Sequence, residues 1–319
     1  MSRPRTFQDA RCLVTGASSG LGRALAEGLV RSGARVILTG RSAERLDAVA
    51  RGLIDNGARP EALDRVIADL TKADDRQRLF DITADRLGAL DLVVNSAGVG
   101  AYGRFESHDE SVLRKIFEIN LFALAEVCRA ALPLLRLGTR PALVNLGSIV
   151  ARRALPGRPE YSASKFAVAG LTESLRAEWA IDGISVLLVN PGFTATAFES
   201  NLVVDTAIYK TNSHREMTAE QVALATLEAL RQGRHELTLS PGGRLLLLVN
   251  RLLPRVVDWG LSRWTRRLYA DPRALALAEQ RIWPPQSSTF RVTNEPRPPH
   301  RPSRRPISPP PIPDRSRVR

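Results

Sequence analysis

Cysteine is scarce in this chain, because Cys12 and Cys128 are the only two among 319 residues, and apolar residues surround both. A disulfide framework or a thiolate metal site needs several cysteines at suitable spacing. We therefore expect two buried, reduced thiols, with no disulfide and no metal site.

Long apolar runs are also missing. The longest uninterrupted run in the C-terminal third is residues 245–249, far below the ~20 residues that span a bilayer. Residues 1–11 contain arginines but no apolar segment of the secretory kind. A hydrophobic content of 44% is still enough for a full core. We expect a cytoplasmic protein built on one α/β domain.

Arginine supplies most of the positive charge, because there are only four lysines: Lys72, Lys115, Lys165 and Lys210. Of the formal net charge of +13, residues 284–319 contribute eight arginines against Glu295 and Asp314, a net of +6. The same residues hold eleven of the 21 prolines, so we expect an extended, disordered tail. Such tails can bind nucleic acid through charge, but no aromatic residues alternate with these arginines, and we favour a solvated tail.

A short apolar strand at residues 13–15 runs directly into a glycine-rich turn, and helical periodicity follows as far as Gly33. Glycines let the backbone approach a pyrophosphate, and a helix N-terminus offers unpaired N–H groups. The spacing is Gly-x3-Gly-x-Gly, and a flexible loop is the alternative for an isolated turn of this kind. Its place between a strand and a long helix favours a dinucleotide-binding turn made of Gly16, Ser18, Ser19, Gly20, Leu21 and Gly22.

The second expected strand, at residues 35–39, ends without an acidic residue. An acid there would bind the ribose hydroxyls of NAD, whereas this chain has Gly40 and Arg41. The guanidinium of Arg41 can pair bidentately with a 2′-phosphate. Two other interpretations stay open, a solvated arginine that opens the next helix or one that stacks on adenine. We expect NADP(H) as the preferred cofactor, with NAD(H) as the other candidate.

Strand and helix patterns alternate six times as far as residue 190, which predicts a parallel sheet covered by helices on both faces. Ligands of such sheets bind at the carboxyl ends of the strands. Asp69, Asn95 and Thr194 all follow expected strands, and Asp69 can accept a hydrogen bond from an adenine amino group. Asn120 interrupts the apolar pattern of a long helix expected over residues 109–135, where a buried amide needs partners, a water among them.

Ser148 follows the fifth expected strand, at residues 142–146, and Tyr161 comes thirteen residues later. Tyr161 and Lys165 are four apart on an expected helix over residues 159–181, so they project from one face. A hydroxyl that orients a substrate oxygen, a phenol that exchanges its proton and an ammonium that lowers the pKa of the phenol would form a proton-transfer site. Such spacings also occur by chance, so the prediction depends on the nucleotide turn at the same sheet edge.

In order and spacing, these motifs resemble the short-chain dehydrogenase/reductases over residues 9–240. The resemblance is carried by Thr15, Gly16, Gly20, Gly22, Asp69, Leu70, Asn95, Ser96, Ala97, Gly98, Asn120, Ser148, Tyr161, Lys165, Pro191 and Gly192. Most members have a second asparagine where this chain has Ser96. The basic residue that some NADP-using members carry in the glycine turn is absent.

The resemblance implies a Rossmann-type, doubly wound parallel sheet and hydride transfer between a nicotinamide cofactor and a ketone or secondary alcohol. It implies that Tyr161 is the general acid/base and that Ser148 positions the substrate oxygen. Lys165 would bind the nicotinamide ribose and lower the pKa of Tyr161, Asn120 would hold a water in a proton relay, and Thr194 would contact the carboxamide. The further cofactor-binding positions that it implies are Leu70, Asn95, Ala97, Gly98, Pro191 and Gly192.

A non-catalytic nucleotide-binding regulatory or scaffold protein is the alternative function. Such a protein need not keep all four polar residues of the proposed catalytic set, so we favour an enzyme. We expect a small, apolar carbonyl or alcohol substrate and a homo-oligomer.

The segment of residues 195–217 lies where the family places the cover of its substrate site. Apolar residues in this segment, together with Phe193 just before it, suggest a pocket wall: Phe193, Phe198, Leu202, Val203, Val204, Ile208 and Tyr209. Packing of two short helices is the alternative.

After a helix at residues 219–232 and a strand at 236–239, residues 243–270 combine apolar residues at helical spacing with arginines, interrupted at Pro254. Such a segment can pack on the main domain, lie on the inner membrane surface or bind a partner protein, and we favour packing. We therefore expect a dinucleotide-binding and catalytic domain at 1–242, an amphipathic helical extension at 243–283 and the tail at 284–319.

Overall fold

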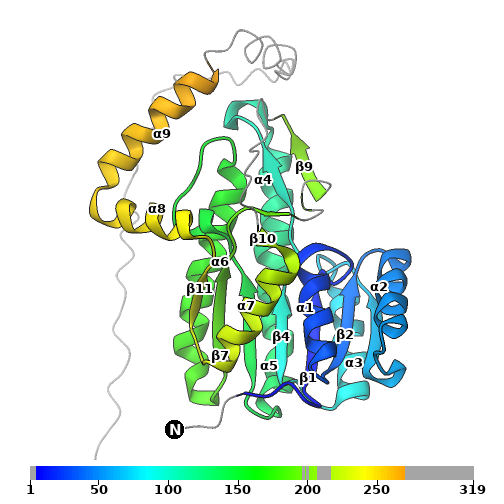
Figure 1. Cartoon of the computed structure of the whole chain (residues 1–319). Coiled ribbons are helices and arrows are strands. Elements are labelled where there is room, and N and C mark those ends of the chain that lie inside the picture. The colour runs from blue at the N-terminus through cyan, green and yellow to red at the C-terminus, as the bar shows by residue number, and fades with distance from the viewer. Residues whose placement is uncertain (1–4, 196–197, 199–200, 207–216, 270–319) are drawn as a thin grey trace, which may run out of the picture. The chain divides into compact units, whose positions relative to one another are not determined.

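The computed structural model describes residues 5–195, 198, 201–206 and 217–269 (Figure 1). The chain divides into residues 1–283 and 284–319, and every described residue belongs to the first unit. The expected tail, together with Ile208 and Tyr209, therefore lies outside the described residues.

Seven parallel strands form the central sheet, in the order β11-β7-β6-β4-β1-β2-β3. They are β1 (Arg11–Thr15), β2 (Arg35–Gly40), β3 (Leu63–Ile67), β4 (Leu92–Asn95), β6 (Ala142–Leu146), β7 (Ser185–Asn190) and β11 (Glu236–Thr238). Each neighbouring pair is parallel, so all the carboxyl ends meet at one edge. The predicted doubly wound parallel sheet is confirmed.

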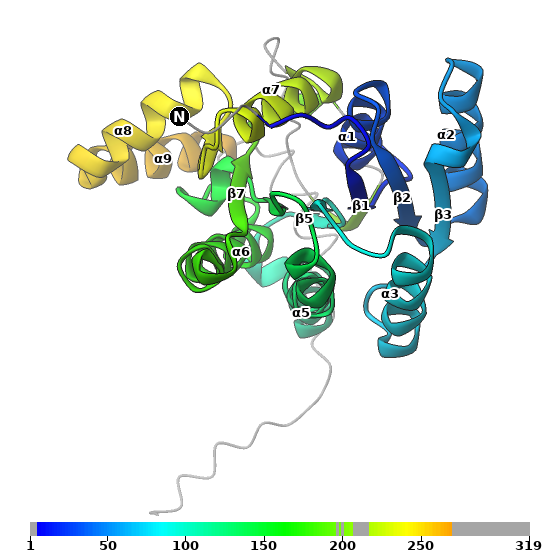
Figure 2. The same ribbon diagram turned by 90° about the horizontal axis from the view of Figure 1, so that it is seen from below.

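Helices cover both faces of this sheet, with α1 and α7 on one side and α3, α5 and α6 on the other (Figure 2). The nine α-helices of the described residues are α1 (Gly20–Arg31), α2 (Ala43–Asp55), α3 (Ala73–Leu87), α4 (Glu110–Phe117), α5 (Ala123–Arg136), α6 (Pro159–Glu178), α7 (Ala219–Arg231), α8 (Pro241–Leu252) and α9 (Pro254–Tyr269). Side chains of each strand alternate between the faces: Cys12 and Val14 pack with α1 and α7, whereas Leu13 packs with α3 and α5. The strands are apolar almost throughout because both faces are buried.

The long helix expected over residues 109–135 is present but irregular. A π-helical turn, Glu118–Phe122, lies between α4 and α5 and contains Asn120. The extra residue of a π turn changes the direction of the side chains that it carries. Asn120 is completely buried here, so it does not point to solvent as mid-helix asparagines usually do.

In the described part of residues 195–217, Phe198 and Asn201 have 3₁₀ geometry, but residues 202–205 do not form the second of the short helices that we considered. Instead, Leu202–Asp205 is strand β9, which pairs in parallel with β5 (Gly100–Tyr102). Val203 and Val204 pack against a small apolar cluster that includes Ala101 and Ile116, and β-branched residues suit such a half-buried strand. A second short ladder joins β8 (Thr194–Ala195) to β10 (Met217–Thr218).

The C-terminal extension forms two helices. Helix α8 ends at Leu252 and Pro254 begins α9, so the interruption predicted at this proline is confirmed. Proline suits the first turn of a helix because the N–H that it lacks would have no helical partner there. None of the helices that the structure describes is long and apolar enough to cross a bilayer.

Candidate active site

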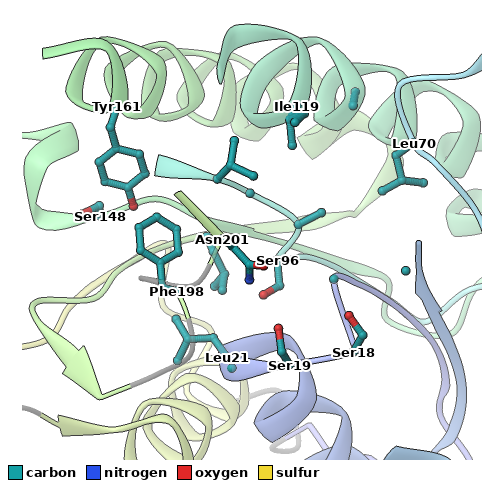
Figure 3. A pocket seen from close by; sticks show the side chains of 18 of the residues that line it. Ser18, Ser19, Leu21, Leu70, Ser96, Ile119, Ser148, Tyr161, Phe198 and Asn201 are labelled. Carbon is teal, nitrogen blue, oxygen red and sulfur yellow. The ribbon is translucent and has the colours of Figure 1, made fainter. Parts of the chain in front are cut away.

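A cavity of about 820 Å³ lies along the carboxyl edge of the sheet. Figure 3 shows Ser148, Tyr161 and Phe198 at one end and Leu70 at the other, with Ser18 nearer to Leu70. The predicted site residues that line it are Gly16, Ser18, Ser19, Gly20, Leu21, Arg41, Asp69, Leu70, Ala97, Gly98, Ser148, Tyr161, Lys165, Pro191, Gly192 and Thr194. Among the predicted site residues, Gly22, Asn95 and Asn120 lie outside this lining.

Two glycines of the nucleotide turn have no room for a side chain. Gly16 has a φ of +64°, and a Cβ there would lie 2.8 Å from the backbone nitrogen of Ala97. A Cβ on Gly22 would collide with the carbonyl oxygen of Gly16, so Gly22 shapes the turn although it does not line the cavity. Within the described chain, the Ser19 side chain makes no capping hydrogen bond to α1. The free N–H groups and the close backbone approach fit a pyrophosphate at this position.

The other end of the cavity combines cations with a carboxylate. Arg41 lies at the cavity edge after β2, and Asp69 follows β3. Burial raises the pKa of Asp69, but hydrogen bonds from the Thr71 hydroxyl and N–H and the charges of Arg41 and Lys72 outweigh it and leave the pKa below its usual value. Arg45, one helical turn after Arg41, also lines the cavity. Sequence reasoning missed Arg45, and its spacing from Arg41 was the available signal.

Asn95 points into the protein interior. Its side-chain amide donates to Asn145 Oδ1 at 2.9 Å and to Cys128 Sγ at 3.3 Å, and Asn145 in turn donates to Thr172 Oγ1 at 3.0 Å. Asn95 and Asn145 are direct neighbours in the β4–β6 register. This buried network joins two central strands to α6, so the Asn95 side chain supports the end of β4 from behind the cavity.

Asn120 links three parts of the site. Its Oδ1 accepts a hydrogen bond from Val99 N at 2.8 Å, and its Nδ2 donates to Val99 O at 2.9 Å and to Ser164 Oγ at 3.0 Å. Val99 follows directly on Ala97 and Gly98, which line the cavity. Asn120 therefore fixes the loop after β4 to helix α6, which carries Tyr161 and Lys165.

The structure brings Ser148, Tyr161 and Lys165 together. Ser148 begins the short 3₁₀ turn Ile149–Ala151 after β6, and the hydroxyl of Tyr161 points toward its side chain (Figure 3). Lys165 Nζ donates to Leu146 O at 2.8 Å and lies 5.7 Å from the centre of the Tyr161 ring. The phenol and the amine thus share one helix face and the same strand end.

Burial dominates the pKa values of Tyr161 and Lys165. It raises the pKa of Tyr161 to about 12, although the Ser148 hydrogen bond and the charge of Arg158 lower it. Burial also lowers the pKa of Lys165 to about 8. We expected the ammonium to lower the pKa of Tyr161, but removal from water disfavours both charged forms and decides the direction in this state of the protein.

Several lining residues at the Tyr161 end were not predicted. The Arg158 guanidinium lies 4.1 Å from the ring centre of Tyr102 and 5.0 Å from that of Phe193. Phe198, which we had placed in a pocket wall, lies 5.4 Å from the Tyr161 ring centre. Lining residues that sequence reasoning missed here include Tyr102, Ile119, Arg158 and Asn201. They come from segments far apart in the sequence and belong to no motif.

Comparison with known proteins agrees with this architecture. Residues 10–206 match the family model for short chain dehydrogenases. The "Dehydrogenase/reductase SDR family protein 7-like" of Anopheles gambiae is 30% identical over 271 residues, which cover 80% of this chain and 83% of the relative.

Solved structures share the fold. A short chain dehydrogenase from Burkholderia cenocepacia J2315, in complex with NADP, is 27% identical with a TM-score of 0.69, covering 81% of this chain and 99% of that one. A short chain dehydrogenase/reductase from Burkholderia phymatum, in complex with NAD, has a TM-score of 0.71 at 24% identity, with 79% and 96% covered. The chain belongs to the short-chain dehydrogenase/reductase family of NAD(P)-binding oxidoreductases.

Proposed function

We propose that the protein is an NADP(H)-dependent oxidoreductase that interconverts a small, apolar ketone and its secondary alcohol. The observation that carries the proposal is the environment of Tyr161. Its hydroxyl points toward Ser148, Lys165 lies one helical turn away, and all three share a cavity with the glycine turn.

The nicotinamide cofactor supplies or accepts the hydride when it is bound. In reduction, the Tyr161 hydroxyl gives its proton to the carbonyl oxygen, and in oxidation it takes the proton from the alcohol. Ser148 donates a hydrogen bond to the same oxygen and orients it. Because burial keeps Tyr161 protonated in the cofactor-free chain, the residue is ready to act as the acid of the reductive direction.

Asn120 acts as a positioning residue in this proposal. Its amide holds Val99 and Ser164, and through them the loop after β4 and helix α6. Any water of a proton relay would be held within this arrangement.

The preference for NADP(H) is supported by charge at the end of β2. Arg41 and Arg45 line the cavity there, and Gly40 occupies the position where an acid would bind ribose hydroxyls. Solved relatives are complexed with NAD in one case and with NADP in another, so the choice depends on the residues of this chain.

An apolar substrate is supported by the side chains around Tyr161. Tyr102, Ile119, Phe193 and Phe198 line this end of the cavity. Rings and branched side chains favour a carbonyl compound with apolar substituents.

We also propose a cytoplasmic homo-oligomer. Both cysteines are buried free thiols, as in reducing compartments, and Phe122 and Phe166 expose about half of their surface on the same side of the sheet, beside α5 and on α6. Light scattering of the unmodified chain and of Phe166→Glu should show an oligomer that the substitution weakens. A monomer in both would contradict this part of the proposal.

The test of the function is a panel of apolar ketones and alcohols followed at the absorbance of the reduced nicotinamide, with both cofactors. We expect turnover on some members and a higher kcat/KM with NADPH than with NADH. Tight cofactor binding without turnover on any member would instead support the non-catalytic nucleotide-binding protein.

A further inference from the structure

The C-terminal helices carry an unusual amount of exposed apolar surface. Of the fifteen large hydrophobic side chains that are exposed in the described chain, seven lie between residues 245 and 264. Six of them follow one another at intervals of one to four residues and define what we call the docking face: Leu245, Leu248, Leu252, Leu253, Val256 and Trp259. An apolar surface of this kind is typical of a contact site.

The opposite side of α8 already has its partners. Gly243 lies against Ile149, and Leu247 packs in the cluster formed by Ile149, Val150 and Tyr161. In addition, the guanidinium of Arg153 donates to Asn250 Oδ1 at 3.0 Å.

Helical spacing separates the two sides of α8. Leu245, Leu248 and Leu252 lie at positions i, i+3 and i+7, opposite Gly243 and Leu247. Packing on the main domain therefore accounts for one side of α8, and no described residue covers the docking face.

Helix α9 continues the docking face past a corner at Leu253, between the helices labelled α8 and α9 in Figure 1. Val256 and Trp259 are exposed, while Val257 is buried on the other side of the helix. Asp258, the single acidic residue of residues 241–269, is paired with Arg153 at 2.5 Å. Both helices are thus attached to the main domain through Arg153.

The charge of these helices indicates what covers the docking face. Residues 241–269 contain six arginines against Asp258, a net of +5. Arg263, Arg266 and Arg267 surround a hollow on α9 beside Trp259, and the guanidinium of Arg263 lies 6.0 Å from its ring centre. A second copy of the same face would bring like charges together, which disfavours self-association. Apolar side chains flanked by arginines instead suit an anionic lipid surface.

We propose that α8 and α9 dock the protein on an anionic membrane surface. The leucines, Val256 and Trp259 enter the interface, tryptophan being well suited to the boundary between acyl chains and headgroups. The arginines reach the lipid phosphates, and each one strengthens binding by about fivefold.

Docking would place the catalytic cluster close to lipid. Leu247 on the inner side of α8 contacts the cluster that contains Tyr161, so only this helix, ~10 Å across, separates the cluster from the membrane. A substrate dissolved in the lipid would then reach a nearby cavity, an extension that rests on the proposed function.

Vesicle sedimentation with the full chain tests the docking itself and needs no turnover. The unmodified protein should bind phosphatidylcholine vesicles that contain phosphatidylglycerol at least ~10-fold more tightly than phosphatidylcholine alone, and added salt should weaken the binding. The double variant Leu248→Gln/Trp259→Gln should lose ~10-fold or more in affinity. Leu224→Gln on α7 is the matched control, because Leu224 and Leu248 are each 55% exposed, and it should bind normally.

Because both variants keep the net charge of +6 on residues 284–319, a loss confined to the double variant assigns binding to the docking face. Equal vesicle binding by the double variant and the unmodified chain would overturn the proposal, as would no binding to either vesicle. An oligomer that dissociates in the double variant would assign the face to a second copy and overturn it too. Vesicle binding without carbonyl turnover would leave docking intact and count only against the proposed function.

Discussion

Replacing Asn120 by alanine tests whether this residue holds the site together. The substitution removes three hydrogen bonds and leaves the N–H and C=O of Val99 without their partners in a completely buried region. Each buried backbone group left unpaired costs about 1–3 kcal/mol, so the free energy of unfolding should fall by about 3–5 kcal/mol. In a protein of this size the melting temperature should fall by roughly 10 °C.

Urea denaturation followed by circular dichroism measures this loss, and a cofactor titration shows whether the loop after β4 has moved. Ser164→Ala removes one acceptor of Asn120 and one donor to Tyr161 O but leaves both groups of Val99 paired, so it should cost less, about 1–2 kcal/mol. Asn56→Ala is the control at an exposed asparagine and should cost less still. If Asn120→Ala unfolds within about 1 kcal/mol of the unmodified chain, Asn120 does not hold the site in the way described.

Three further predictions concern the cofactor site and its titration. Arg41→Ala should weaken NADPH binding by roughly 10-fold or more and NADH binding little, because a charged hydrogen bond to phosphate is lost. Lys72→Ala, at a residue outside the cavity lining, is the control. Equal losses of NADPH and NADH affinity in Arg41→Ala would contradict a phosphate-binding role of Arg41. Gly22→Ala should abolish binding of both cofactors because its Cβ meets a backbone oxygen, whereas Gly170→Ala, with open space around it, should bind normally in the same titration. Burial lowers the pKa of Lys165 from 10.5 to about 8, so the unfolded chain keeps its proton to a higher pH than the folded chain does. The stability of the cofactor-free protein should therefore rise between about pH 8 and 10. Thermal melts in which Lys165→Met shows the same rise would refute this cause.

Much of the fold could be predicted because its signals are local. Apolar segments bounded by glycine and polar residues gave the strands of the central sheet, and periodic apolar residues gave the helices. The interruption at Pro254 was also readable, since proline restricts the backbone wherever it occurs.

Features that depend on distant contacts were not predicted. Strand β9 forms because residues 202–205 meet β5, about a hundred residues earlier in the chain, and four apolar or acidic residues alone do not specify a strand. The π turn around Asn120 likewise has no sequence pattern of its own, since the buried partners Val99 and Ser164 determine where the amide points.

The candidate site divides in the same way. Residues in motifs at strand ends came to line one cavity, because parallel strands bring their carboxyl ends together. Arg158 belongs to no motif, and its place in the lining could be found only from the fold. The direction in which the pKa of Tyr161 shifts could also be found only from the folded structure, because burial is a property of the packed chain and not of a spacing between residues.

The central claim is that Tyr161 transfers the proton of a carbonyl reduction, and Tyr161→Phe tests it most directly. The change removes one hydroxyl and keeps the ring in its contact with Phe198, so cofactor affinity should survive. Single-turnover reduction of the best ketone of the panel should slow by roughly 10²–10⁴. Ser162→Ala, which removes the buried hydroxyl of the next residue, should reduce the ketone at a nearly normal rate. Near-normal reduction by Tyr161→Phe would contradict the assignment of Tyr161 as the acid.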